Sequence, residues 1–202
     1  LEYTLNDMIV SKVWVGDVVK VIATFSEAIA EDPVMQIVGS GLQNIDPTAM
    51  TRVDDLTYHF VWEVADTVGT QNFTLSTGTD VVGNLVIEAP TSGAEIQVNY
   101  REALVSMIRG WNLISLNVTP TESGNLLYLL KPLQSSLVYV FNERFKMLRR
   151  RPTGDWSDGV GDWQMTEGYY VKLSGQGEVK IPGKRLKLPI DIDLEKGWNI
   201  VP

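Results

Sequence analysis

Alternation of apolar and polar side chains at every second residue is the feature that most constrains the fold of this chain. It is clearest over residues 55–64, where five apolar side chains fall on one side of an extended segment: Leu56, Tyr58, Phe60, Trp62 and Val64. Successive side chains of a strand point to opposite faces, so these five cover one face of a sheet. Full burial of such a side chain contributes about 1.5–3 kcal/mol. The segment is therefore predicted to be a half-buried strand.

Shorter extended segments follow one another through the first hundred residues. Besides residues 55–64, strands are predicted in these ranges: 18–25, 35–38, 72–76, 85–87 and 96–98. Turn-forming residues separate them at intervals of about 8–12 residues, and we find no convincing helical period before residue 100. About seven short strands spaced in this way are typical of a β-sandwich.

Composition narrows the class of protein further. With 202 residues, 44% of them hydrophobic, the chain is long enough for one large or two ordinary folded domains. It has no cysteine, which excludes thiol catalysis, cysteine-ligated zinc and disulfides. No apolar run approaches the roughly 20 residues that a membrane-spanning helix needs. Because no basic, apolar signal segment begins the sequence, we expect a piece of a longer or processed chain.

Charge divides the sequence near residue 100. Residues 1–100 contain 14 acidic and 3 basic side chains, whereas residues 101–202 contain 11 acidic and 14 basic ones. A step from −11 to +3 supports two domains. The acidic first half argues against a nucleic-acid partner, whose phosphates it would repel.

Two turn motifs of the first half carry a resemblance. Gly16-Asp17 precedes a strand that ends in Phe25-Ser26-Glu27, and Asp80-Val81-Val82-Gly83-Asn84 follows far downstream. This combination resembles the bacterial Ig-like repeats of surface proteins over roughly residues 3–99. The resemblance implies a seven-stranded Ig-like sandwich, export from the cell and no enzymatic activity. We assign residues 1–100 to this domain.

The second half is bracketed by Gly110-Trp111-Asn112 and Gly197-Trp198-Asn199, with Glu167-Gly168-Tyr169-Tyr170 between them. In this order the motifs are similar to a β-rich module found near the ends of bacterial and archaeal secreted or cell-surface proteins. The resemblance implies location and architecture for residues 104–202 rather than a biochemical role. Trp111 and Trp198 are expected to be structural residues of the first and last strands.

Other elements of this domain follow from local patterns. Dense leucines at residues 126–130, stopped by Pro132, predict one short helix. Alternation over residues 186–194 predicts a late strand, and Pro189 places it at an edge because proline lacks an amide donor. The junction at residues 99–103 has no Pro, Gly or Ser run, so we expect a stiff connection.

Groups that could carry catalysis are few. His59 is the only histidine, and its place on the outward side of the predicted strand favours a solvent-facing residue over a triad or a metal ligand. Asp191, Asp193 and Glu195 form a row along one strand, whereas glycosidases need two carboxyls facing across a cleft. The chain has no phosphate loop, nucleophile elbow or dinucleotide fingerprint. We therefore predict that it is not an enzyme.

Clustered carboxylates raise the question of calcium. Asp155, Asp158 and Asp162 lie within one glycine-containing loop and could converge on Ca²⁺, although the spacing is not that of an EF-hand. Asp80 is a further candidate, together with Asn84. The alternative for all four is ordinary turn chemistry, in which Asp accepts hydrogen bonds from nearby backbone amides. No other cofactor is predicted.

Aromatic residues near the same loop suggest a second kind of site. Trp156, Trp163 and Tyr169 are candidates for a carbohydrate platform, because sugars stack on aromatic rings beside a few polar groups. The alternative is that these rings pack in the core. Residues 149–151, three consecutive arginines, could grip a polyanion or the acidic first domain, or could simply be solvated.

The sequence thus predicts an all-β, non-enzymatic segment of a secreted or cell-surface protein. It would act as a structural spacer or adhesion module whose partner is a protein or glycan at the cell surface. The alternative is a carbohydrate-binding accessory module of an extracellular enzyme.

Overall fold

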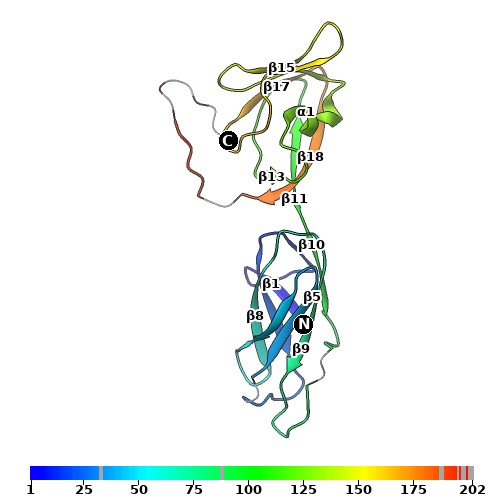
Figure 1. Cartoon of the computed structure of the whole chain (residues 1–202), viewed down its shortest axis with the longest axis vertical. Helices are drawn as coiled ribbons and strands as arrows, with labels where there is room; N and C mark the ends of the chain where they lie inside the picture. Colours follow the sequence, from blue (N-terminus) through cyan, green and yellow to red (C-terminus); the bar gives the residue numbers. More distant parts are fainter. Residues whose placement is uncertain (32–33, 87–88, 187–188, 195, 197–198, 200–202) are drawn as a thin grey trace. The chain divides into compact units, whose positions relative to one another are not determined.

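The computed structural model describes residues 1–31, 34–86, 89–186, 189–194, 196 and 199. Strands make up 51% of the described residues and helices 4%, so the fold is all-β as predicted. Contacts divide it into two compact units, Leu1–Tyr100 and Arg101–Pro202, here called the N-terminal and C-terminal units (Figure 1). Among the described residues, no helix has the length and apolar character needed to cross a membrane.

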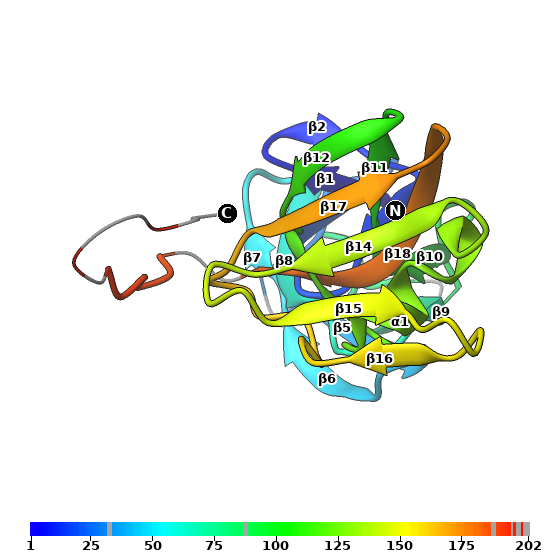
Figure 2. The same ribbon diagram turned by 90° about the horizontal axis from the view of Figure 1, so that it is seen from above.

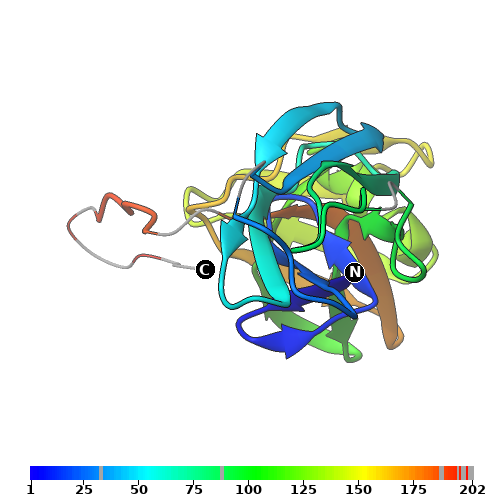
Figure 3. The same ribbon diagram turned by 90° about the horizontal axis from the view of Figure 1, so that it is seen from below.

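The N-terminal unit consists of two five-stranded sheets (Figure 3). The first has the order β2-β1-β4-β8-β7, with these bounds: β1 Glu2–Leu5, β2 Met8–Ile9, β4 Val18–Thr24, β7 Thr51–Arg52 and β8 Thr57–Glu63. The second has the order β3-β10-β9-β5-β6, with these bounds: β3 Lys12–Trp14, β5 Gln36–Gly41, β6 Ile45–Ala49, β9 Gly69–Thr77 and β10 Glu95–Asn99. Neighbouring strands in both sheets pair antiparallel, except β3 and β10, which are parallel.

The predicted alternation along residues 55–64 is confirmed in β8. Tyr58, Trp62 and Val64 are buried, and the Trp62 ring meets Phe73 of the other sheet edge-on at 5.2 Å. Leu56 is an exception and is exposed, because the chain is still turning there: the Val53 amide donates to the Thr57 carbonyl. The core therefore forms between the inward faces of the two sheets.

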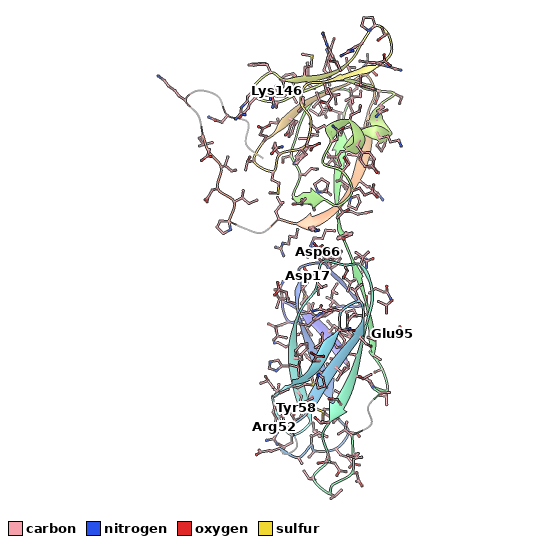
Figure 4. The ribbon with its side chains drawn as sticks, viewed as in Figure 1. Asp17, Arg52, Tyr58, Asp66, Glu95 and Lys146 are labelled. Carbon is pink, nitrogen blue, oxygen red and sulfur yellow. The ribbon has the colours of Figure 1, made fainter. Side chains whose placement is uncertain are left out.

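Ion pairing occurs at the start of β8, where Arg52 of β7 contacts two carboxylates (Figure 4). Its guanidinium nitrogens lie 2.6 Å from Glu31 and 2.5 Å from Asp55. These partners are largely exposed, so the pairs add little to stability.

One polar side chain lies fully inside this core. The Gln71 side-chain oxygen accepts from the Gln43 amide at 2.8 Å, and its nitrogen donates to the Gln43 carbonyl at 3.0 Å. A β-carbon at Gly39 would lie within 2.9 Å of both Gln71 and Ile45, so this position in β5 requires glycine. Nothing in the alternation pattern indicated this network.

The C-terminal unit also has two sheets. The smaller, of order β11-β18-β13, contains β11 Arg101–Met107, β13 Val118–Pro120 and β18 Gly177–Arg185. The larger, of order β12-β17-β14-β15-β16, is seen with its strands side by side in Figure 2. Its bounds are β12 Gly110–Ile114, β14 Leu137–Phe141, β15 Met147–Arg150, β16 Trp156–Asp158 and β17 Tyr169–Leu173.

The predicted short helix is confirmed as α1, Leu126–Leu129, followed by the 3-10 turn η1, Lys131–Leu133. Asn125 caps α1 by accepting a hydrogen bond from the Tyr128 amide, and Pro132 lies at the start of η1. Leu126 and Leu129 are buried in the core that the two sheets of this unit enclose. The helix thus contributes apolar surface to the core.

Two strand predictions were wrong. Residues 189–194 are not in a strand; both neighbours of the preceding strand β18 are already taken, by β11 and β13, and alternation alone supplies no pairing partner. Leu85 and Val86 also lie outside the named strands, although Leu85 forms an isolated bridge with Thr79. Trp198 and Glu195, which the sequence placed on strands, lie outside the described residues.

Candidate binding surface

The carboxylates of the loop at residues 155–163 hold the loop itself. Asp158 Oδ1 accepts from the amides of Val160 at 3.0 Å and Gly161 at 2.7 Å. Its Oδ2 accepts from the side-chain amide of Asn125 at 2.9 Å, which ties the loop to the residue that caps α1. This is the turn chemistry weighed above as the alternative to calcium binding.

Asp155 and Asp162 do not join Asp158 in a cluster. Asp155 Oδ2 accepts from the Thr153 hydroxyl at 3.3 Å, and Asp162 forms a backbone bridge with Asn125. Nowhere in the described ranges do three or more His, Cys, Asp or Glu side chains gather around a position suited to a metal. The structure therefore lends no support to calcium in this loop.

Asp80 likewise serves its own turn. Its Oδ1 accepts from the amides of Val82 at 2.9 Å and Asn84 at 2.8 Å, and its Oδ2 accepts from the Asn84 side chain at 2.6 Å. These hydrogen bonds, the one from the Asn84 side chain foremost, hold the pKa of the Asp80 carboxyl below its usual range. Both oxygens are engaged within the turn.

The predicted carbohydrate platform does not open to solvent. Trp163 is 8% exposed, Tyr169 is 0% exposed, and their ring centroids lie 4.6 Å apart. The Tyr169 hydroxyl accepts from the Gln164 amide at 2.9 Å and donates to Glu167 at 3.2 Å, while burial raises the pKa of its phenol to about 12. Trp156 is half-buried against the same core. The packing alternative describes Trp163 and Tyr169, because a sugar cannot reach a buried ring face.

Trp111 lies on a strand of the larger sheet, as predicted, but its ring is not part of the core. Its side chain is 50% exposed on β12, whereas the residues on both sides of it shape the backbone. Gly110 has φ +103°, which favours glycine, and the Asn112 side chain accepts from the Ile108 amide and donates to the Ile108 carbonyl, both at 2.9 Å. Glycine and asparagine of the motif thus form the turn, and tryptophan is displayed.

Strand register arranges the outward side chains of the larger sheet in two rows. Residues directly opposite each other on paired antiparallel strands share a face. One row, the mixed row, alternates aromatic and basic residues across four strands: Trp111, Lys172, Tyr139 and Arg149. The other, the apolar row, runs beside it: Leu113, Tyr170, Phe141 and Met147. Together they are called the aromatic face.

Phe141 lies at the centre of the aromatic face. Its ring centroid is 5.0 Å from Tyr170, 5.5 Å from Trp111 and 6.2 Å from Phe145. Phe145, which is 82% exposed, stands on the turn between β14 and β15 at φ +56°. Such contacts between rings of four different segments make one continuous cluster on the solvent side of the sheet.

The turn that carries Phe145 is fixed by a buried side chain. Asn142 Oδ1 accepts from the amides of Arg144 at 3.1 Å and Lys146 at 3.2 Å, and its Nδ2 donates to Glu167 at 3.3 Å. Lys146 marks this turn in Figure 4. A non-glycine residue at positive φ is unfavourable on its own and persists where the surroundings determine it. The protein therefore holds an exposed phenylalanine in a defined position.

Charge on the aromatic face is of one sign. The Lys172 ammonium lies 5.1 Å from the Trp111 ring centroid, in a cation–π contact. The outward residues of the two rows include two basic side chains, Lys172 and Arg149, and no acidic one. Arg144 and Lys146 are exposed on the adjacent turn, which also carries the acidic residue Glu143. The face thus combines aromatic rings with positive charge.

A groove of about 590 Å³ on the C-terminal unit has a different character. It lies along β11 and is lined mostly by apolar side chains, among them Leu104, Leu116 and Ile190. Among the described residues that line this groove, Glu102 is the one with a titratable side chain.

The sequence did not reveal most of the aromatic face, because residues were singled out by type and not by the side of the strand that each one faces. Tyr170 and Lys172 alternate with the buried residues of β17, but this outward set was not followed onto Tyr139 and Phe141. Comparison with protein-family models, curated proteins and solved structures found no match to this chain. The two resemblances stated above therefore remain predictions.

Proposed function

We propose that this chain is a non-enzymatic segment of a secreted or cell-surface protein, with a spacer in its N-terminal unit and an adhesion module in its C-terminal unit. The observation that carries the proposal is the aromatic face, an exposed cluster of rings and aliphatic side chains on an ordered sheet. Contiguous apolar patches of this kind on soluble proteins mark interaction sites.

Folding does not explain the aromatic face. The opposite face of the same sheet supplies the core, with Val140, Leu148 and Val171 fully buried. The rings therefore stand outside a complete core, where their half-exposed area gives little stability. Aromatic and arginine side chains dominate the energy of binding interfaces. We therefore expect the aromatic face to contact a partner.

The path of the chain through the N-terminal unit suits a spacer. The Leu1 amino group donates to the Ser92 carbonyl at 2.6 Å, and the Tyr3 hydroxyl donates to the Gly93 carbonyl at 2.7 Å, just before β10 begins. At the far end of β10, the Asn99 carbonyl accepts from Val15 at 3.0 Å. The two ends of this unit are thus separated by the length of β10.

The assignment as non-enzymatic is supported by how the reactive groups are used. The carboxylates of Asp158 and Asp80 accept hydrogen bonds within their own turns, and His59 lies on the outward side of β8 opposite Ile22. The adhesion module would act by binding a partner rather than by catalysis.

A carbohydrate-binding accessory module is the second candidate, and the mixed row favours it. Rings that alternate with basic groups across a flat sheet can stack on sugar faces and bind sugar substituents. Under this candidate the same aromatic face binds a glycan on behalf of a linked enzyme.

Retention on immobilised ligands tests the proposal. The whole chain is applied to a printed glycan array and to surfaces coated with collagen, fibronectin or mucin, beside Trp111→Ala and Val61→Ala variants. Val61 is exposed on β8 and serves as an apolar control outside the aromatic face. We expect retention on at least one surface, at least tenfold weaker in Trp111→Ala and unchanged in Val61→Ala. Absence of retention everywhere, or equal retention by all three proteins, contradicts the proposal.

A further inference from the structure

We infer that the ligand of the aromatic face is a carboxylated polysaccharide that crosses the strands along the mixed row. In this arrangement the rings of Trp111 and Tyr139 stack on sugar faces, while Lys172 and Arg149 bind carboxylates. The inference rests on the proposed function, because it names the partner class of the same surface.

The first support is the order of residue types in the mixed row. Aromatic and basic side chains alternate from β12 through β17 and β14 to β15. Neighbouring strands lie about 4.7–4.9 Å apart, so the two cations are separated by roughly 9–10 Å and so are the two rings. A polymer that alternates a charged sugar with a neutral one presents its groups in the same order.

The second support is the chemistry of each contact. A charge-assisted hydrogen bond between Arg or Lys and a carboxylate is shorter and stronger than a neutral one. The apolar row lies beside the cations, and the Trp111 contact holds Lys172 near the ring. A ligand must therefore bring both a flat apolar surface and negative charge.

Single-stranded nucleic acid also combines stacking with negative charge, but it fits this chain poorly. Binding of nucleic acid draws mainly on neutralisation of many phosphates by Lys and Arg, which the mixed row with two cations does not provide. An acidic protein segment would satisfy the cations without stacking along the whole row.

Binding of defined polymers tests the inference. The probe is hyaluronate, in which carboxylated and neutral sugars alternate, measured by affinity electrophoresis and calorimetry with the whole chain. Carboxyl-reduced hyaluronate supplies the sugar faces without charge, poly-L-glutamate supplies carboxylates without sugars, and oligo(dT) supplies phosphates and bases. Thermal melting of every variant confirms that it is folded.

We expect hyaluronate to bind at least tenfold more tightly than each of the three other polymers, and to weaken as salt rises. Trp111→Ala and Lys172→Gln should each weaken hyaluronate binding at least tenfold. Lys180→Gln, an exposed lysine on β18 of the other sheet, is the matched control and should bind like the wild type.

Other results overturn the inference in distinguishable ways. Equal binding of carboxyl-reduced hyaluronate shows a neutral-sugar platform, equal binding of poly-L-glutamate an acidic protein partner, and equal binding of oligo(dT) a nucleic-acid surface. If hyaluronate does not bind but Trp111→Ala still abolishes retention on the array or coated surfaces, the inference fails and the proposed function stands. If Trp111→Ala changes no binding at all, both fail.

Discussion

The loop at residues 155–163 and the aromatic face are both rich in aromatic rings and charged groups. In the loop these groups mainly contact the protein itself, whereas on the aromatic face they face solvent. In the loop, Asp158 bonds backbone amides and Asn125, and Trp163 packs on Tyr169 inside the core. On the aromatic face, Trp111 and Phe145 extend into solvent. The difference shows that a segment rich in aromatic and charged residues need not leave those groups available to a partner.

Strand phase is the physical origin of this contrast. Tyr169 and Tyr170 are adjacent, yet one is fully buried and the other contributes to the aromatic face, since successive residues of β17 point to opposite sides. A one-residue change of phase would exchange their roles. Each prediction below probes one side of the contrast.

The largest effect is expected from the same substitution at the two tryptophans. Trp163→Ala should lower the free energy of unfolding of the C-terminal unit by about 3–5 kcal/mol, because it empties a core site. Trp111→Ala should change the same quantity by less than about 1 kcal/mol, because its ring is half exposed. Urea denaturation of both variants measures the difference, and equal losses would remove the contrast.

Alkaline pH should lower the stability of the C-terminal unit through Tyr169, which lies in its core. The pKa of Tyr169 is raised from 10.0 to about 12, so the neutral phenol is favoured in the folded unit. Its stabilising contribution is complete below pH 10 and is lost as the pH rises toward 12. Chemical denaturation across this range should show a smaller decline for Tyr169→Phe than for the wild type; identical declines would show that this phenol is not linked to stability.

Within the loop, Asp158 should matter more than Asp155. Asp158→Ala removes the acceptor of two backbone amides and one side-chain amide and should cost about 1 kcal/mol. Asp155→Ala removes one contact, at 3.3 Å, and should cost less than about 0.5 kcal/mol. Thermal melting of the two variants compares them directly, and the reverse order would contradict the assigned turn.

Calcium should have the smallest effect. Asp155, Asp158 and Asp162 do not converge, and Asp80 is engaged in its turn. We therefore expect that a chelator removes no bound ion from the folded protein. A ligand that binds only the folded state must raise its stability. The melting temperature should therefore differ by less than about 1 °C between excess chelator and millimolar calcium. A clear rise with calcium would restore the metal site.

The parts of the fold that could be predicted depend on local pattern. Alternation located β4 and β8, a leucine cluster before Pro132 located α1, and turn residues located the Asp80–Asn84 turn. Each is decided mainly by neighbouring residues. The buried Gln71 network and the course of residues 189–194 depend on contacts distant in sequence, which alternation does not encode.

For the candidate site, the sequence predicted the types of residue and of partner but not which residues come together. Rings, arginines and a cell-surface partner were expected, but the aromatic face needs the register that places Trp111 opposite Lys172 and Tyr139 opposite Arg149. That register depends on β17 inserting between β12 and β14, a pairing of segments far apart in the chain. The sequence motifs therefore led to the hypothesis that the binding site lies in the 155–163 loop.

Indole resonances report most directly on which region binds. The ¹⁵N-labelled whole chain is titrated with hyaluronate oligosaccharides, and the tryptophan side-chain N–H signals are followed after assignment by substitution. The account predicts that the Trp111 signal shifts progressively while the Trp163 signal stays fixed. A shift of Trp163 with an unchanged Trp111 would return the binding site to the loop and contradict the account.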